Sequence, residues 1–158
     1  MMSAMPVIVS NRALQDLSVM FYDAPQDPTP NVQILSKEKL DFTIESLSHV
    51  EEYLDHVRKH SYRGRQATSL ILRSGAYVGE VIRRHAKSKR WHWLAYAEAI
   101  KLSPDIAKLG KDLYTSAILW DSKDEFSFPL GKVMKYLQNG EEDSVKFYAQ
   151  VVANEGTG

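Results

Sequence analysis

The sequence predicts an α+β fold, in which several helices pack around a small antiparallel sheet in a single domain of residues 36–158. Two observations lead to this prediction. Apolar residues recur every three or four positions over long stretches, which is the spacing of a helix that buries one face. Shorter stretches rich in aromatic and β-branched residues lie between prolines and glycines, as strands do. A chain of 158 residues is long enough to form a core without disulfides or metal.

The N-terminal part, residues 1–35, is predicted to be an arm that precedes this domain. Its apolar pattern indicates a short helix over residues 13–23. The stretch DAPQDPTPN at residues 23–31 follows, and its prolines forbid a continuing helix. After the prolines, VQIL at residues 32–35 is expected to form a short edge strand.

The clearest helix of the sequence is predicted over residues 41–60. Asp41 or Thr43 is expected to cap its start, because both side chains accept hydrogen bonds from free backbone amides. Gly64 is expected to take the left-handed conformation that ends it. One apolar stripe runs along this helix and consists of Leu40, Ile44, Leu47, Val50, Leu54 and Val57.

A second helix is predicted over residues 68–86, and it contains Gly75 and Gly79 one turn apart. Each glycine weakens a helix by about 1 kcal/mol relative to alanine. Two of them on one face therefore predict that another backbone approaches the helix closely there. The buried side is expected to consist of Ile71, Leu72, Ala76, Val78, Gly79 and Ile82.

Short strands are predicted in the second half of the chain. Trp91 and Trp93 alternate around His92, as the residues of a half-buried strand do. Residues 113–122 form a β-rich stretch and are predicted to be a strand. Residues 123–129 are expected to supply a turn and a partner strand.

Three helical segments complete the predicted fold. Ser103 is expected to cap a short turn that has Pro104 in its first position. A longer helix is predicted from Pro129 to Gly140. The last helix covers residues 141–154, with three acids at the positive end of the helix dipole. The residues expected to pack are Leu130, Val133, Met134 and Leu137 in the former and Val145, Tyr148, Val151 and Val152 in the latter.

Charge is unevenly distributed along the chain, although the net charge is zero. Residues 1–57 carry a net charge of −6, residues 58–101 carry +9 and residues 102–158 carry −3. In one interpretation, the acidic and basic segments face each other in the fold and cancel. In the other, a basic face is offered to a polyanion or to an acidic partner.

The densest basic run precedes the two tryptophans. Phosphates attract such charges and bases stack on indole rings, so the run is a candidate nucleic-acid site. The alternation of Trp91 and Trp93 instead favours a core strand, with the basic residues at a helix end where the dipole stabilises them. Glu80 is expected to pair with Arg83 or Arg84 one turn on. The run comprises Arg83, Arg84, Lys87, Lys89 and Arg90, and Arg58, Lys59, Arg63 and Arg65 are expected to extend it.

No sequence motif names a catalytic or metal site. His56 and His60 lie four residues apart with Glu52 one turn earlier, but HVRKH lacks the glutamate of the HExxH zinc motif. There is no GxSxG nucleophile motif and no phosphate-binding loop. The chain has no cysteine, which excludes disulfides, thiolate metal sites and cysteine nucleophiles. We therefore expect neither a metal nor a cofactor.

The sequence shows no sign of membrane targeting. Its first residues lack the basic start and the apolar run of a signal peptide. No window approaches the run of about 18 apolar residues that a spanning helix needs. We therefore expect a cytoplasmic protein that does not bind a membrane.

Three stretches resemble a group of small bacterial domains of unknown function. They are LDFTIESLSHVEEYL, GAYVGEVIRRH followed by a tryptophan, and FPLGKVMKYLQNGEEDSVKFYAQ, in this order. The resemblance covers residues 40–150, and the glycine-containing helix and NGEEDSV are its most specific parts. It implies a bacterial, cytoplasmic, helix-rich domain with a small sheet. Similar domains occur among toxin-immunity and other accessory proteins, and the resemblance brings no catalytic residues with it.

These observations predict a non-enzymatic protein-binding module, such as an immunity or regulatory protein, that meets another protein through a charged surface. One alternative is a nucleic-acid-binding protein that uses residues 83–93. A further alternative is an enzyme of unrecognised type that uses His56, His60 or His92. The residues expected to contact a partner protein are Arg83, Arg84, Lys87 and Arg90 on a basic face, or Glu51, Glu52 and Asp55 on an acidic face.

Overall fold

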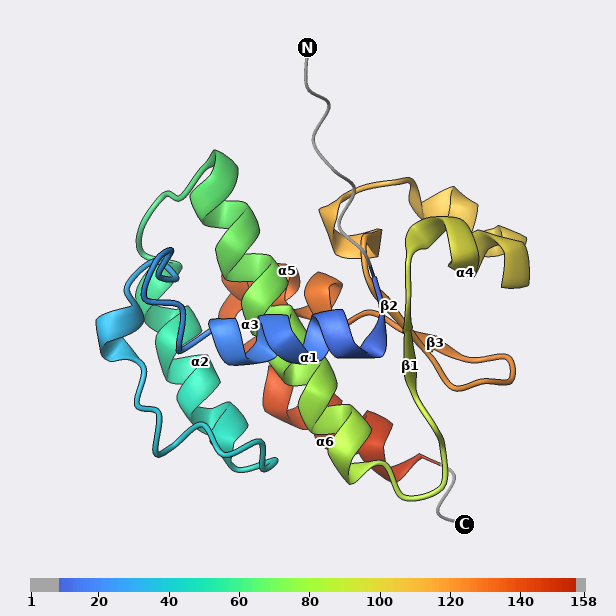
Figure 1. The fold of residues 1–158 in the computed structure, drawn as a ribbon, viewed down its shortest axis with the longest axis horizontal. Coiled ribbons are helices and arrows are strands. Elements are labelled where there is room, and N and C mark those ends of the chain that lie inside the picture. Colours follow the sequence, from blue (N-terminus) through green and yellow to red (C-terminus); the bar gives the residue numbers. More distant parts are fainter. Residues whose placement is uncertain (1–8, 156–158) are drawn as a thin grey trace.

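Helix α3 (Gly64–His85) is the axis around which the other elements pack (Figure 1). The computed structural model describes residues 9–155. Helix α1 crosses one face of α3, and α5 and α6 cover the opposite face, so the middle of α3 is buried on all sides. The remaining helices are α1 (Asn11–Met20), α2 (Ser46–Val57), α4 (Tyr96–Leu102), α5 (Pro129–Asn139) and α6 (Val145–Asn154), with short 3-10 helices η1 (Val32–Ile34), η2 (Pro104–Leu109), η3 (Leu113–Thr115) and η4 (Gly140–Asp143).

A small sheet lies beside α3, on the side away from α2 (Figure 1). It consists of β1 (His92–Leu94), β2 (Ile118–Trp120) and β3 (Phe126–Ser127) in the order β1-β2-β3. Both pairs are antiparallel. Helices packed around a small antiparallel sheet confirm the predicted α+β fold.

Both tryptophans that precede and enter the sheet lie in the core. Trp91 is 4% exposed and Trp93 is 3% exposed. The predicted alternation around His92 is therefore confirmed, and β1 is the core strand that it indicated. A second, smaller cluster consists of Ala99 of α4, Ile106 of η2 and Ile118 of β2.

The two glycines of α3 lie at close contacts, and the predicted approach of another backbone is confirmed at Gly75. A Cβ atom at Gly75 would lie 2.7 Å from Leu130 Cδ1 and 3.0 Å from the Leu130 Cα. At Gly79 the neighbour is a side chain instead of a backbone, because a Cβ there would lie 2.1 Å from the Trp93 ring. These glycines therefore let α5 and β1 approach α3 directly.

The predicted edge strand at residues 32–35 is wrong, because this segment forms η1. Asn31 adopts a left-handed conformation with φ 57° and turns the chain. The following hydrogen bonds are local, from the Ile34 amide to the Asn31 carbonyl and from the Leu35 amide to the Val32 carbonyl. The segment therefore bonds to itself instead of pairing with a strand.

The helix predicted over residues 41–60 is shorter, since α2 begins at Ser46 and ends at Val57. Phe42 has a left-handed φ of 63°, which a helix cannot contain. Its amide donates to the Tyr77 hydroxyl at 2.9 Å, and its ring stacks on Tyr77 with centroids 4.6 Å apart. Packing on α3 therefore overrides the helical pattern, although the Thr43 hydroxyl still accepts from the Ser46 amide as a cap does.

Three predictions in the second half need correction. The stretch 113–122 is a strand only at Ile118–Trp120, because Asp112 caps η3 by accepting from the Leu113 amide at 2.7 Å. Ser103 precedes η2 but makes no side-chain capping bond. The last helix begins at Val145, where the Ser144 hydroxyl accepts from the Phe147 amide, so its three acids lie in η4 before it.

Residues 9–31 of the predicted arm pack into the main core with the rest of the chain. Leu14 and Phe21 are fully buried there. Arg73 of α3, only 4% exposed, donates to the Asp27 carbonyl at 2.7 Å and forms an ion pair with its carboxylate at 3.1 Å. Thr29 also accepts from Arg73. The proline segment is therefore anchored to α3, while residues 1–8 of the arm lie outside the described residues.

Within residues 9–155, none of the helices combines the length and the apolar character that crossing a bilayer requires.

Candidate functional site

The predicted basic run lies at the C-terminal end of α3 and in the loop that leads to β1. Arg83 is used inside the fold, since it donates to both Glu80 carboxylate oxygens at 3.1 and 2.9 Å and to the Trp91 carbonyl at 2.9 Å. Glu80 is 2% exposed and also accepts from Trp93 Nε1 at 2.9 Å. The predicted Glu80–Arg83 pair is therefore confirmed, and it fixes the loop against α3.

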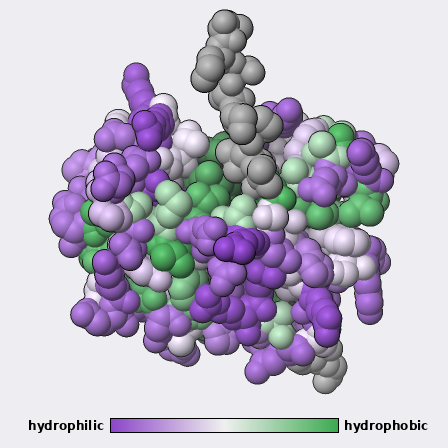
Figure 2. Space-filling model, viewed as in Figure 1, coloured by the Kyte–Doolittle hydropathy of each residue, from purple (hydrophilic) through white to green (hydrophobic). Residues whose placement is uncertain are grey.

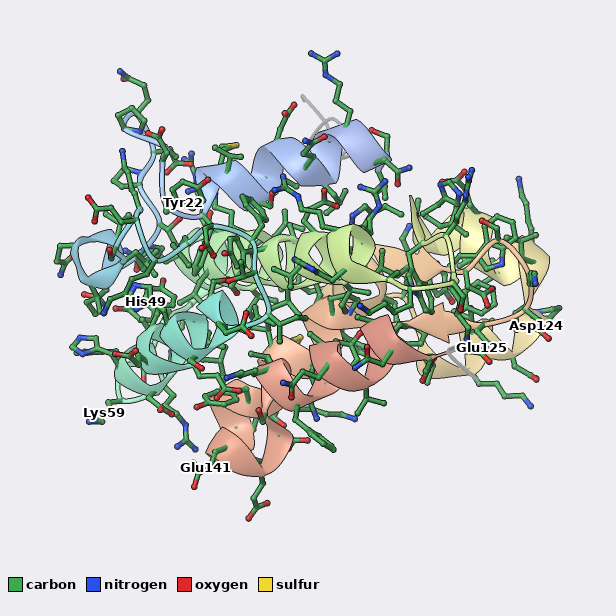
Figure 3. The ribbon with its side chains drawn as sticks, turned by 90° about the horizontal axis from the view of Figure 1, so that it is seen from below. Tyr22, His49, Lys59, Asp124, Glu125 and Glu141 are labelled. Carbon is green, nitrogen blue, oxygen red and sulfur yellow. The ribbon has the colours of Figure 1, made fainter. Side chains whose placement is uncertain are left out.

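Lys89 is also neutralised within the fold. Its ammonium forms ion pairs with Glu125, with Glu155 at 3.3 Å and with Asp121 at 3.8 Å. The hydrogen bond to Glu125 is the main reason that the pKa of Lys89 is raised. Burial opposes ionisation of Asp121, but the Glu125 and Lys123 amides donate to it and hold its pKa below the usual value. Figure 3 shows Glu125 near the tip of the β2–β3 hairpin.

Arg84, Lys87 and Arg90 remain exposed, and we call these three residues the α3-end surface. Within the part of the chain that the structure describes, none of them forms an ion pair. The Arg84 guanidinium lies 3.8 Å from the centroid of the Phe42 ring, which holds it in place. Hydrophilic residues cover the C-terminal half of α3 in Figure 2.

The predicted extension of the basic run is wrong. Arg58, Lys59, Arg63 and Arg65 lie near the N-terminal end of α3, and Arg83 and its neighbours lie at the other end of the same helix. Arg65 pairs with Asp27 at 3.1 Å. Figure 3 shows Lys59 at the end of α2, on the opposite side of the molecule from Asp124 and Glu125. The basic segment therefore forms two separate surfaces.

The predicted acidic face of α2 is largely used to hold the C-terminal helices. Glu51 accepts from the Ser144 hydroxyl at 2.6 Å and from the Lys146 amide at 3.1 Å. Asp55 accepts from the Tyr136 hydroxyl at 2.8 Å. Burial and this bond to Asp55 raise the pKa of Tyr136. Glu52 and Asp55 are exposed, and Glu52, with 65% of its side chain exposed, lies 3.8 Å from His49 Nδ1.

The histidines are not assembled into a site. His56 and His60 are exposed with ring centroids 5.3 Å apart, and His92 bonds to the Asn11 side chain at 3.1 Å. Among residues 9–155, no three His, Cys, Asp or Glu side chains are grouped so that they could hold a metal ion.

An exposed apolar pair on α6 was missed by the sequence analysis. Phe147 is 66% exposed, and Val151, predicted to pack, is 44% exposed. The segment carries apolar residues on two faces, and only the face with Val145, Ala149 and Val152 is buried. The four-residue spacing of Phe147 and Val151 is the signal that would have indicated a second stripe.

Comparison with protein-family models, with curated proteins and with solved structures gave no match to this chain. The resemblance to small bacterial domains therefore stays a prediction, and what the chain does must be argued from its own surfaces.

Proposed function

We propose that this protein is a non-enzymatic, cytoplasmic protein-binding module that contacts an acidic partner through the α3-end surface. One observation carries the proposal. Arg84, Lys87 and Arg90 are exposed without an ion-pair partner in residues 9–155, whereas the neighbouring Arg83 and Lys89 are neutralised inside the fold. The surplus positive charge of this segment is therefore available to a partner.

The surface is suited to recognition because its backbone is already fixed. Arg83 bonds to the Trp91 carbonyl, and the Lys87 amide donates to the Ala153 carbonyl at 3.0 Å. Little conformational entropy is therefore lost when a partner binds, whereas ordering a flexible loop would lower the affinity. Exposed charges on such a frame speed encounter with an oppositely charged surface and select against like-charged partners.

An acidic protein fits this surface better than a nucleic acid. Stacking of bases needs exposed aromatic rings, and Trp91 and Trp93 are 4% and 3% exposed. A nucleic acid could therefore bind this surface only through its phosphates. A bacterial immunity or regulatory factor needs only such a binding surface, and this is the role that we infer.

Capture from nuclease-treated host lysate tests the proposal. The wild-type chain should retain an acidic protein, and Arg84→Glu combined with Arg90→Glu should lose it. Lys111→Glu is the matched control, because Lys111 is exposed but lies in the segment before η3. With the purified partner, the charge reversal should slow association about tenfold or more at low salt. Equal capture by the double variant and the wild type would refute the proposal. Capture seen only in a parallel lysate without nuclease would assign the surface to nucleic acid.

A further inference from the structure

A second feature lies at the opposite end of α3, in the loop that joins α2 to α3. There a cavity of about 330 Å³ opens between the end of α2, the start of α3 and α5. We call it the α2–α3 cavity. Its floor is apolar and consists of Val57, Leu70, Ile71 and Leu137, of which the first three are 1%, 2% and 9% exposed.

The rim of the α2–α3 cavity is cationic. Arg58 and Arg63 line it together with His60, and all three side chains are exposed. No acidic residue is among the described residues that line it. The Arg58 guanidinium donates to the carbonyls of Leu137 and Gln138 at 3.4 and 3.3 Å. Because these acceptors are neutral, Arg58 is held in place without losing its charge.

The loop that carries this rim is tied to the rest of the fold. The Asn31 side chain donates to the Tyr62 hydroxyl, and the Tyr62 ring lies 5.9 Å from that of His60. The next arginine, Arg65, pairs instead with Asp27 and does not line the cavity. Arg58 and Arg63 therefore concentrate the positive charge of this loop at the cavity mouth.

We propose that the α2–α3 cavity binds a small organic carboxylate with a compact apolar body. The Arg63 guanidinium can meet a carboxylate with two parallel hydrogen bonds, and Arg58 adds its positive charge. The apolar floor excludes water from the body of the ligand, and the volume falls within the range of small-molecule sites. An inorganic anion leaves the floor unused, and a neutral apolar molecule leaves the positive charges of Arg58 and Arg63 without an anion. The site is distinct from the α3-end surface and independent of the proposed partner.

Three probes of graded chemistry test this site in the full chain. 3-Phenylpropionate has both the carboxylate and the apolar body, 3-phenylpropionamide lacks the charge, and acetate lacks the ring. Each is titrated while the backbone amide signals are followed by NMR. 3-Phenylpropionate should shift the amides around Leu70 and Ile71, and the other two probes should bind about tenfold more weakly. Equal binding of all three probes, or shifts confined to other regions, would overturn the proposal.

Paired variants separate the cavity from general surface charge. Arg63→Gln should weaken 3-phenylpropionate binding about tenfold, since a charged hydrogen bond is lost. Arg65→Gln removes the same charge two residues away, outside the cavity, and should leave the affinity unchanged. The NMR spectra report directly that both variants are folded. An equal loss of affinity in both variants would mean that the probe is attracted by surface charge in general and not by a site. Neither variant changes the α3-end surface, so both should still capture the partner protein, and failure of this proposal is distinguishable from failure of the proposed function.

Discussion

The side chain missing at Gly79 is what allows the ring of Trp93 to lie against the backbone of α3. Glu80 follows Gly79, accepts a hydrogen bond from Trp93 Nε1 at 2.9 Å and forms an ion pair with Arg83. A single turn of helix thus fixes both the plane and the polar edge of the indole. Close packing of this kind leaves no room for an added methyl group.

Gly79→Ala is expected to lower the free energy of unfolding by about 1–3 kcal/mol, because the new Cβ would overlap the Trp93 ring. Gly131→Ala is the control. A Cβ at Gly131 has its nearest neighbours at 3.6 Å, so this change in α5 should be neutral or stabilising by up to about 1 kcal/mol. Urea unfolding of both variants checks the difference, and equal stabilities would contradict this packing.

His49 is a buried histidine held neutral by its surroundings. Its Nε2 accepts from the Ser36 amide at 2.9 Å, so the proton of the neutral ring is on Nδ1. Nδ1 lies 3.8 Å from Glu52 and has no hydrogen-bond partner among the described residues. Burial lowers the pKa of His49 despite the nearby Glu52 carboxylate.

Stability should therefore fall on acidification, and His49 should contribute to that fall. Its folded pKa lies below the unfolded value of about 6.5, so the unfolded chain takes up the proton first. The contribution is complete above about pH 6.5 and is lost as the pH falls through the folded pKa. In His49→Gln, a neutral amide oxygen can accept from Ser36 without titrating. Urea midpoints at about pH 7.5 and 5 should differ less in this variant than in the wild type, and identical differences would argue against the assignment.

At the scale of elements, one ammonium group connects three segments that are distant in the sequence. Lys89 from the α3–β1 loop meets Asp121 and Glu125 of the β2–β3 hairpin and Glu155 after α6. Three carboxylates around one cation repel each other when the cation is removed. The stability of the β2–β3 hairpin therefore depends on Lys89, which lies outside the hairpin.

Lys89→Met is expected to loosen the hairpin. The amide of Asp121, which donates to the Glu125 carbonyl at 3.0 Å, should exchange its hydrogen faster. Added salt should restore part of the protection, because it screens repulsion between the Glu125 and Glu155 carboxylates, which are 52% and 39% exposed. Lys123→Met removes an exposed lysine from the same hairpin and should have little effect. Unchanged exchange in Lys89→Met would show that the ion pairs do not support the hairpin.

The elements that the sequence predicts well are those whose own pattern decides their structure. Helix α5 begins at Pro129 and ends before Gly140, as predicted from proline and glycine chemistry. Phe42 and residues 32–35 depend on Tyr77 and on the turn at Asn31, which local patterns do not contain. The sequence also shows how much charge a segment carries but not which charges pair. Only the structure shows that Arg83 forms an ion pair with Glu80 while the neighbouring Arg84 forms none with the described residues.

At the scale of the whole molecule, α1 belongs to the same core as the helices that follow it. Leu14 and Phe21 are both fully buried, and the Phe21 ring meets Tyr53 of α2 at 5.2 Å and Tyr77 of α3 at 5.8 Å. An N-terminal segment packed in this way cannot unfold without exposing the centre of the molecule. We therefore expect the described chain to unfold in one cooperative step.

Two optical signals check this expectation. Circular dichroism follows the helices, and tryptophan fluorescence follows Trp91, Trp93 and Trp120 in and next to the sheet. Their urea transitions should coincide, and Leu14→Ala should shift both equally, at a cost of about 2–5 kcal/mol. Val19→Ala on the same helix, where Val19 is 38% exposed, should shift neither appreciably. Two separate transitions would mean that α1 unfolds independently.

The length of α3 has a consequence for how its two ends act. A helix of 22 residues spans about 33 Å, whereas electrostatic potentials at physiological salt decay over about 8 Å. Roughly four such decay lengths therefore separate Arg84 of the α3-end surface from Arg63 at the mouth of the α2–α3 cavity. An anion bound at the cavity mouth is therefore largely screened from the exposed charges at the other end, so strong coupling between the two ends would require a change in structure.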